Sequence, residues 1–294
     1  MPCGAVGWGP RPGSDPHQQP AGPELPSPVD SVAVMTGADA QDDQARAAWQ
    51  SILVDGRESL RLMQRFFRLL PSAPRCKICH NPFGGVGGRL LAVAGFRPSR
   101  KNPNLCERCC ESMPPGGLEV DVAVLFADVR GSTALAERIG AAAFADLLNR
   151  FYRTATSVLV RHDAIIDKLI GDEVMALFLP GIAGPRYRRR AAEAAVDLVS
   201  TLASRVELPI GAAVDAGNAY VGNVGGEGVL DFTALGDPVN TAARLQAEAA
   251  AGEVVVADDV FAEIRARYPT ARARSVSVRG RRQPVDVHVV TVSG

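Results

Sequence analysis

The sequence of 294 residues is poor in aromatic side chains, which make up 5% of it, and its 32 basic residues balance its 32 acidic ones. A neutral chain with few aromatic rings lacks the basic, base-stacking surface typical of nucleic-acid-binding proteins, so we expect no nucleic-acid partner. The sequence contains no apolar run of about 18 residues, and no transmembrane helix is predicted. Its first residues lack the charged segment and apolar stretch of a secretory signal, which predicts a cytoplasmic protein.

The N-terminal part of the chain is rich in residues that oppose packing. Eight of the 21 prolines and five glycines fall within the first 28 residues. Such a segment buries too little apolar surface to offset the entropy lost on ordering. Residues 1–43 are therefore predicted to be a disordered tail, with a docking peptide as the alternative. Residues 44–70 repeat apolar side chains at helical spacing and end before a proline, which predicts a helix that packs on its own domain or on a second copy, with a membrane-surface helix as the alternative.

Two Cys-x2-Cys pairs, separated by 26 residues, mark residues 71–112 as a small module. Four thiolates in this pattern are typical of a tetrahedral zinc site in a compartment where disulfides are rare. The predicted zinc ligands are Cys76, Cys79, Cys106 and Cys109. An iron–sulfur cluster, a redox switch and reduced thiols are the alternatives, and His80 or Cys110 can substitute as a ligand. A module of about 40 residues is expected to need its metal to fold, and we expect it to regulate or dimerise the domain that follows.

After a linker at residues 113–118, strand and helix patterns alternate to the end of the chain. Strands are predicted at 120–129, 164–170 and 173–178, helices at 141–161 and 188–206, a hairpin at 210–214 and 219–224, a helix that starts near Pro238 with Asp237 as its cap, and three more short elements. The order β-α-β-β-α-β predicts an α+β domain of the ferredoxin-like kind with C-terminal additions.

Two acidic residues lie where predicted strands end. Asp128 closes the strand at 120–129 and precedes a turn that contains glycine, and Asp172 lies in a tight turn between two strands. Paired carboxylates on neighbouring strands suit divalent metal ions in phosphoryl or nucleotidyl transfer. Taken singly, the same residues are typical of a helix cap and of a turn.

Three further polar residues have a spacing that suits nucleotide chemistry. Lys168 precedes Asp172 by four residues, and an extended chain of that length spans roughly 13 Å. That distance is too long for one nucleotide's base and phosphate, so the two residues are expected to serve different copies of a site. Asn240 and Arg244 share one helix face, where an amide and a guanidinium can orient a ribose and stabilise charge; a solvated capping pair is the alternative.

Three stretches in this order resemble the class III nucleotidyl cyclases: Leu-Phe-Ala-Asp-Val-Arg-Gly-Ser-Thr at 125–133, Asp-Lys-Leu-Ile-Gly-Asp-Glu-Val-Met-Ala-Leu-Phe at 167–178, and Phe-Thr-Ala-Leu-Gly-Asp-Pro-Val-Asn-Thr-Ala-Ala-Arg-Leu at 232–245. The resemblance covers about residues 119–292 and implies a catalytic domain of that family at 119–294. It also implies a homodimer, with each site shared between the two subunits.

Carried over to the matching positions, the resemblance implies a role for each candidate residue. Two Mg²⁺ or Mn²⁺ ions are held by Asp128, the carbonyl of Val129 and Asp172; the triphosphate meets Ser132 and Thr133; the base is selected by Lys168 and Thr233; and the ribose and transition state are contacted by Asn240 and Arg244. Family members often carry a basic residue just before the strand of Thr233, whereas this chain has Glu-Gly-Val-Leu at 227–230. Arg279 is the candidate for a polyphosphate contact, with a solvated hairpin charge as the alternative.

The identity of the base follows from hydrogen-bond polarity. Adenine N1 is an acceptor and suits the ammonium of Lys168, whereas guanine N1 carries a hydrogen and would oppose it. Thr233 is less decisive because a hydroxyl can donate or accept, and in this family threonine there marks a subgroup of which some members respond to bicarbonate. The predicted function is an adenylate cyclase that converts ATP to 3′,5′-cyclic AMP and pyrophosphate.

Other functions account for fewer of these residues. The main alternative is a catalytically weak nucleotide-binding regulatory or scaffold protein of the same fold. A polymerase or diguanylate cyclase is disfavoured because Gly-Asp-Glu at 171–173 lacks the Gly-Gly-Asp/Glu-Glu-Phe signature, and a zinc-ribbon nucleic-acid binder is disfavoured by the neutral charge and scarce aromatic side chains.

Overall fold

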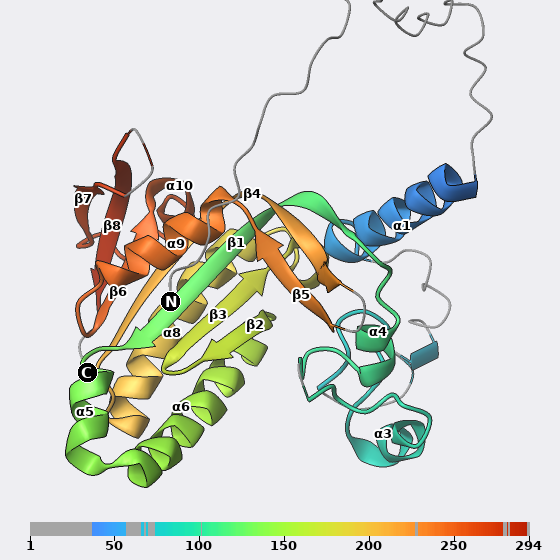
Figure 1. Ribbon diagram of the computed structural model, residues 1–294, viewed down its shortest axis with the longest axis horizontal. Helices are drawn as coiled ribbons and strands as arrows, with labels where there is room; N and C mark the ends of the chain where they lie inside the picture. Colours follow the sequence, from blue (N-terminus) through green and yellow to red (C-terminus); the bar gives the residue numbers. More distant parts are fainter. Residues whose placement is uncertain are drawn as a thin grey trace, which may run out of the picture.

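The computed structural model describes residues 37–56, 66–67, 69, 74–100, 102–226, 229–278, 281 and 283–292 (Figure 1). The strands are β1 Gly117–Val129, β2 Ile165–Ile170, β3 Glu173–Phe178, β4 Ile210–Gly226, β5 Val229–Leu235, β6 Glu253–Ala257, β7 Arg272–Val276 and β8 Val285–Thr291. The helices are α1 Gly37–Leu53, α3 Gly85–Ala92, α4 Glu107–Glu111, α5 Ser132–Ile139, α6 Ala141–Arg161, α7 Pro180–Ala183, α8 Tyr187–Val206, α9 Asp237–Ala247 and α10 Asp258–Phe261. No helix among these residues is both long enough and apolar enough to cross a membrane.

All eight strands belong to one mixed sheet. Its order is β2-β3-β1-β4-β6-β8-β7, and β5 pairs with β4 off this path. The pairing of β4 with β6 is parallel, and the other pairings are antiparallel. The first four strands, in the spatial order β2-β3-β1-β4 and joined through α5, α6 and α8, form the ferredoxin-like arrangement. The predicted fold class is therefore confirmed.

The central strand β1 is buried on both faces, which explains its nearly continuous apolar sequence. Ala123, Leu125 and Ala127 belong to the core beneath α6 and α8. Val122 and Val124 point the other way and belong to a second core, which includes residues of α1, α9 and the cysteine module. The N-terminal elements thus pack on the same sheet that carries Asp128 and Lys168, and they lie at one side of it (Figure 1).

The hairpin predicted at 210–214 and 219–224 is wrong, because β4 is a single strand of 17 residues. The stretch that suggested a turn, Asp-Ala-Gly-Asn at 215–218, pairs residue by residue with β1. The strand reverses only after Gly226, where β5 begins. Glycines permit a close approach of β4 to β1, since a Cβ added at Gly222 would lie 2.3 Å from the Cα of Gly117.

The first helix also differs from its prediction. α1 begins at Gly37, inside the expected tail, and ends at Leu53 rather than continuing to residue 70. Gly56 follows with φ 71°, a left-handed conformation that favours glycine and stops the helix. Trp49 is fully buried, and its ring stacks on Phe232 with centroids 6.0 Å apart. The remainder of the predicted tail at 1–36, and residues 57–65, lie outside the described residues.

Candidate functional site

The two acidic residues singled out by the sequence come together at one end of the sheet. Asp128 is the next-to-last residue of β1, opposite Glu173, and Asp172 occupies the β2–β3 turn, where its carbonyl accepts a hydrogen bond from the backbone of Val129 at 3.3 Å. Burial, a hydrogen bond with Asp172 and the charge of Asp172 together raise the pKa of Asp128 to about 6. A pair of crowded carboxylates is a donor set that favours a bound cation.

The turn after β1 adds a basic residue to this end of the site. Arg130 lies 3.5 Å from the carboxylate of Asp128, and its guanidinium donates to the backbone carbonyl of Gln246 in α9 at 2.6 Å. Gly131 adopts a left-handed conformation with φ 71°, and α5 then begins with Ser132 and Thr133. The contact of Arg130 with α9 was not predicted, because nothing in the local sequence indicates a contact across more than 100 residues.

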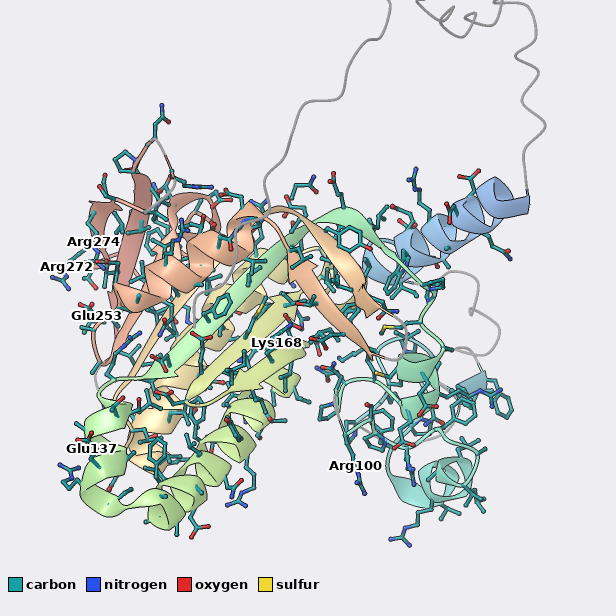
Figure 2. All side chains as sticks on the ribbon, in the orientation of Figure 1. Arg100, Glu137, Lys168, Glu253, Arg272 and Arg274 are labelled. Atoms are coloured by element: carbon teal, nitrogen blue, oxygen red, sulfur yellow. The ribbon has the colours of Figure 1, made fainter. Side chains whose placement is uncertain are left out.

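The base-selecting candidates lie together on β2 and β5. The ammonium of Lys168 donates to the hydroxyl of Thr233 at 3.0 Å (Figure 2 labels Lys168). It also contacts the carboxylates of Asp231 at 2.9 Å and Asp167 at 3.5 Å. Partial burial lowers the pKa of Lys168, but the contacts with Asp231 and Asp167 outweigh burial and raise it. These four side chains, from strands that are far apart in sequence, form one hydrogen-bonded cluster.

Asp167 and Asp231 were not among the residues predicted from the sequence. The signal that was available is their position, because Asp167 precedes Lys168 directly and Asp231 precedes Thr233 by two residues on one strand. Side chains two residues apart on a strand share a face. The side chain of Asp167 is fully buried, whereas that of Asp231 is 40% exposed.

Asn240 and Arg244 lie on the exposed side of α9, four residues apart as expected. The buried side of this helix packs on β4 and β1 through Pro238, Ala242 and Leu245. The predicted cap is wrong by one residue, because Gly236 holds the cap position and Asp237 is the first helical residue. The side chain of Asp237 pairs instead with Arg281, whose Nε lies 3.2 Å from it.

The predicted acidic residues and the predicted base-selecting residues thus form two separate groups. Asp128 contacts Asp172 and Arg130, whereas the contacts of Lys168 are Thr233, Asp231 and Asp167. The two groups share no residue. The last candidate, Arg279, lies outside the described residues.

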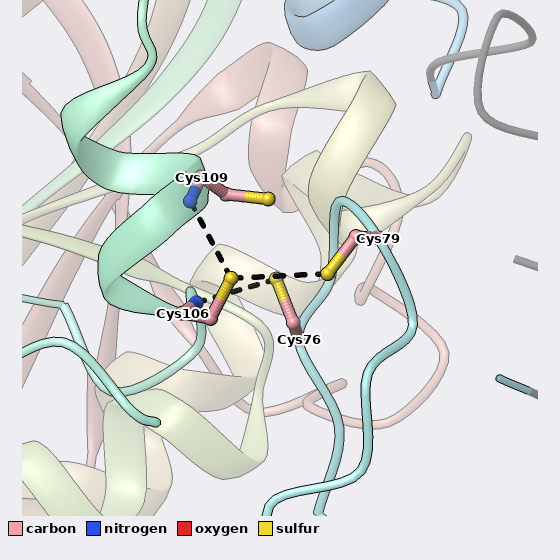
Figure 3. Close-up of side chains that lie close together, drawn as sticks. All are labelled: Cys76, Cys79, Cys106 and Cys109. Carbon is pink, nitrogen blue, oxygen red and sulfur yellow. Dashed lines mark hydrogen bonds between the residues drawn. The ribbon is translucent and has the colours of Figure 1, made fainter. Parts of the chain in front are cut away.

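The four predicted zinc ligands form a second site. The sulfur atoms of Cys76, Cys79, Cys106 and Cys109 are buried and lie within 4.8 Å of one another (Figure 3). The contact with Cys106 lowers the pKa of the Cys76 thiol and raises the pKa of Cys79 and Cys109, because neighbouring sulfurs cannot all ionise without a cation. Backbone N–H groups of Cys106 and Cys109 donate to sulfur at 3.3 and 3.4 Å. The donor set fits zinc, and neither His80 nor Cys110 belongs to it.

The cysteine module is attached to the edge strand β2. The side chain of Asn102 accepts a hydrogen bond from the backbone of Ile166 at 2.8 Å, and Lys77 forms an ion pair with Asp163 just before the strand. An edge strand presents unpaired backbone groups, and Asn102 satisfies one of them, the N–H of Ile166. β2 also carries Lys168, so the module contacts the strand that supplies the lysine of the Lys168–Thr233 group.

Comparison with known proteins identifies the family and the fold of the larger domain. The family described as the adenylate and guanylate cyclase catalytic domain matches residues 118–291. The adenylyl cyclase CyaB of P. aeruginosa superposes with a TM-score of 0.55 at 26% identity, over 60% of this chain and 97% of that one. The guanylyl cyclase Cya2 superposes with a TM-score of 0.56 at 23% identity, over 61% of this chain and 95% of that one, which shows a common fold.

Two proteins of Mycobacterium tuberculosis, both named as uncharacterized, are similar in sequence. One is 29% identical over 272 residues, which cover 88% of this chain and 47% of the relative. The other is 31% identical over 219 residues, which cover 73% of this chain and 36% of the relative. The chain therefore spans about half or less of the length of these relatives.

Proposed function

The chain belongs to the family of adenylate and guanylate cyclase catalytic domains, and on that premise we propose that it is an adenylate cyclase, which converts ATP to 3′,5′-cyclic AMP and pyrophosphate. The observation that carries the choice of base is the ammonium of Lys168 at 3.0 Å from the hydroxyl of Thr233. Adenine N1 accepts a hydrogen bond from an ammonium, whereas guanine N1 carries a hydrogen that would face it. An unpaired donor at a buried contact costs more than a matched one gains, so the pair favours ATP.

The carboxylate pair is proposed as the metal-binding half of the site. Asp128 and Asp172 supply oxygen ligands, together with the carbonyl of Val129, and their mutual repulsion in the metal-free protein is the expected property of such a site. Divalent ions, when bound there, neutralise triphosphate charge and activate the ribose 3′-hydroxyl. Ser132 and Thr133, at the beginning of α5, are proposed to contact the triphosphate through the turn that precedes them.

Asn240 and Arg244 are proposed to act on the ribose and on the charge that develops at the α-phosphate. The ribose 3′-hydroxyl loses its proton to water and its oxygen bonds to the α-phosphorus, while the bond from that phosphorus to pyrophosphate breaks and pyrophosphate leaves with the bonding electrons. A planar guanidinium and an amide on one exposed helix face can hold both groups without covalent chemistry. The role of the protein is then to position the substrate and to neutralise charge.

We further propose that the active form is a homodimer. The carboxylate group and the base-selecting group share no contact residue within one chain, which supports a site assembled from one group of each subunit. Asn240 is proposed to act together with the base-selecting group, so mixing Asp128→Ala protein with Asn240→Ala protein tests this arrangement, since a mixed dimer then contains one intact site. Partial return of activity is expected, and its absence in mixed dimers that have been shown to form contradicts the shared site.

The choice of base is tested by charge reversal. Lys168→Glu is expected to lower the ratio of kcat/KM for ATP to that for GTP by about tenfold or more, because a carboxylate accepts from guanine N1. Arg150→Glu, an equal charge reversal at an exposed position of α6, is the matched control and is expected to retain the wild-type ratio. An unchanged ratio in a folded Lys168→Glu protein contradicts the assignment.

The cysteine cluster is proposed to bind a structural zinc ion. The four thiols are buried close together, so their ionised forms repel one another. A bound zinc ion would neutralise this repulsion and stabilise the thiolates. The attachment of the module to β2 supports a regulatory or structural role toward the base-selecting residues.

A further inference from the structure

A β-bulge in β2 turns two successive side chains toward the same partner. In a regular strand, neighbouring side chains point to opposite faces of the sheet. The pairing of β2 with β3 shifts register between Ile166 and Lys168, so Asp167 is the extra residue of the bulge. As a result, Asp167 and Lys168 both contact the side chain of Thr233 on β5.

The hydrogen of the Thr233 hydroxyl is committed to one of these contacts. Thr233 donates to a carboxylate oxygen of Asp167 at 2.8 Å, and the same hydroxyl oxygen accepts from Lys168 at 3.0 Å. A hydroxyl has a single hydrogen and two lone pairs, so the one remaining interaction that this oxygen can make is as an acceptor. Thr233 can therefore only accept a hydrogen bond from a bound base, although a threonine hydroxyl can in general donate or accept.

The surroundings of Asp167 maintain this polarity. Its side chain is fully buried, and the ammonium of Lys168 lies 3.5 Å from its second oxygen. Burial and the nearby charge of Asp231 raise the pKa of Asp167, while the Thr233 hydroxyl and the Lys168 charge oppose that rise by stabilising the carboxylate. A carboxylate accepts hydrogen bonds and cannot donate one, so it keeps the hydroxyl hydrogen of Thr233 directed away from any base.

We propose that Asp167 is a positioning residue for base specificity, which acts through Thr233 by fixing its hydroxyl as a hydrogen-bond acceptor toward the 6-position of the purine. Adenine carries an amino group there, which donates to such an acceptor, whereas guanine carries an oxygen, which accepts and is repelled. Together with Lys168 at N1, this arrangement gives two matches for adenine and two mismatches for guanine. The inference rests on the proposed function, and it adds a residue outside those that touch the base.

The test is a substitution that reverses the polarity without changing shape. In Asp167→Asn, the side-chain amide can donate to the Thr233 oxygen, which frees the hydroxyl hydrogen to point toward the base. The preference for adenine over guanine is expected to fall by about tenfold or more. The readout is the ratio of affinities for 3′-deoxy-ATP and 3′-deoxy-GTP, measured by calorimetry on the full-length protein, because these nucleotides lack the attacking hydroxyl and report binding without turnover.

A double-mutant cycle distinguishes this role from a general structural one. Thr233→Val removes the hydroxyl, and in that background Asp167→Asn is expected to leave the affinity ratio unchanged. Thr233→Ser retains the hydroxyl and is expected to keep the preference for adenine. Asp167→Ala also releases the hydroxyl hydrogen, and it provides the same test if Asp167→Asn does not fold.

Three results overturn the inference. The first is an unchanged affinity ratio in a folded Asp167→Asn or Asp167→Ala protein. The second is an equal change in the presence and absence of the Thr233 hydroxyl. The third is a wild-type protein that binds neither analogue, which contradicts the proposed function as well. A wild-type protein that prefers the adenine analogue and loses this preference in Asp167→Asn, but forms no cyclic nucleotide, supports the inference and separates it from the failure of the catalytic assignment.

Discussion

The side-chain amide of Asn104, in the cysteine module, donates to the backbone carbonyl of Ala164 at 2.6 Å, directly before the edge strand that carries Lys168. Both partners are buried, and the contact joins residues 60 apart in sequence. The proposed base-selecting half of the site is therefore held in part by the element that contains the four cysteines. Two predictions concern this connection.

Loss of the proposed zinc ion is expected to weaken the proposed base-selecting group. Cys79→Ser removes one of four buried ligands, and the small module should then lose its metal and its packing on β2. We expect zinc content and melting temperature to fall and the KM for ATP to rise. Cys110→Ser is the matched control, because Cys110 lies outside the cluster. A protein that loses zinc but keeps its KM and melting temperature contradicts this coupling.

Asn104→Ala tests the hydrogen bond between Asn104 and Ala164 without changing any of the four cysteines. The substitution leaves a buried carbonyl of Ala164 without its partner, which is expected to cost about 1 to 3 kcal/mol of unfolding free energy. Zinc content should stay at the wild-type level. Asn149→Ala, at an exposed position of α6, is expected to change stability little. Denaturant unfolding and metal analysis measure both quantities, and equal stability of the two variants would show that the contact is not structural.

The carboxylate pair is expected to respond to divalent ions. In the metal-free protein, burial and the neighbouring Asp172 disfavour the charged form of Asp128. Asp128→Asn should therefore melt no lower than the wild type in the absence of divalent ions. Addition of Mn²⁺ should raise the melting temperature of the wild type alone, because a bound ion stabilises the state that holds it. An equal Mn²⁺ shift in both proteins would place the metal elsewhere.

A buried carboxylate outside the site predicts a pH dependence of stability. Burial raises the pKa of Asp215 to about 7, from an ordinary value of 3.8. The folded state thus binds a proton more tightly, and this contribution to stability is complete below pH 3.8 and is lost as the pH rises through 7. Asp215→Asn is expected to be more stable than the wild type at pH 8, by about 4 kcal/mol at most. Asp146→Asn, at an exposed position, is the control, and denaturant unfolding at pH 5 and pH 8 measures the difference.

The sequence predicts the regular parts of this fold well, because local patterns determine them. The helix at 141–161 and the strand at 173–178 have the predicted bounds, because the helix repeats buried apolar residues at helical spacing and the strand is a short continuous apolar run. The hairpin predicted within residues 210–224 failed because Gly217 is typical of a turn, and only the long partner β1 shows that the strand continues through it. Pairing between distant segments is not encoded locally.

In the candidate site, too, some residues follow from local sequence patterns and others depend on tertiary structure. The four cysteines and the pair of Asp128 and Asp172 follow from spacing and from strand ends, and the structure brings each set together. Asp167 does not follow from alternation, because the bulge reverses the direction of its side chain. The contact of Arg130 with α9 depends on tertiary packing alone.

The most direct test of the account is product analysis of the full-length protein with ATP and with GTP, in Mg²⁺ and in Mn²⁺. We predict cyclic AMP from ATP as the main product, and its loss in Asp128→Ala. Cyclic GMP as the main product would contradict the role assigned to Lys168 and Thr233. A folded, dimeric protein that forms neither cyclic nucleotide would contradict the assignment as a cyclase and would favour a nucleotide-binding scaffold.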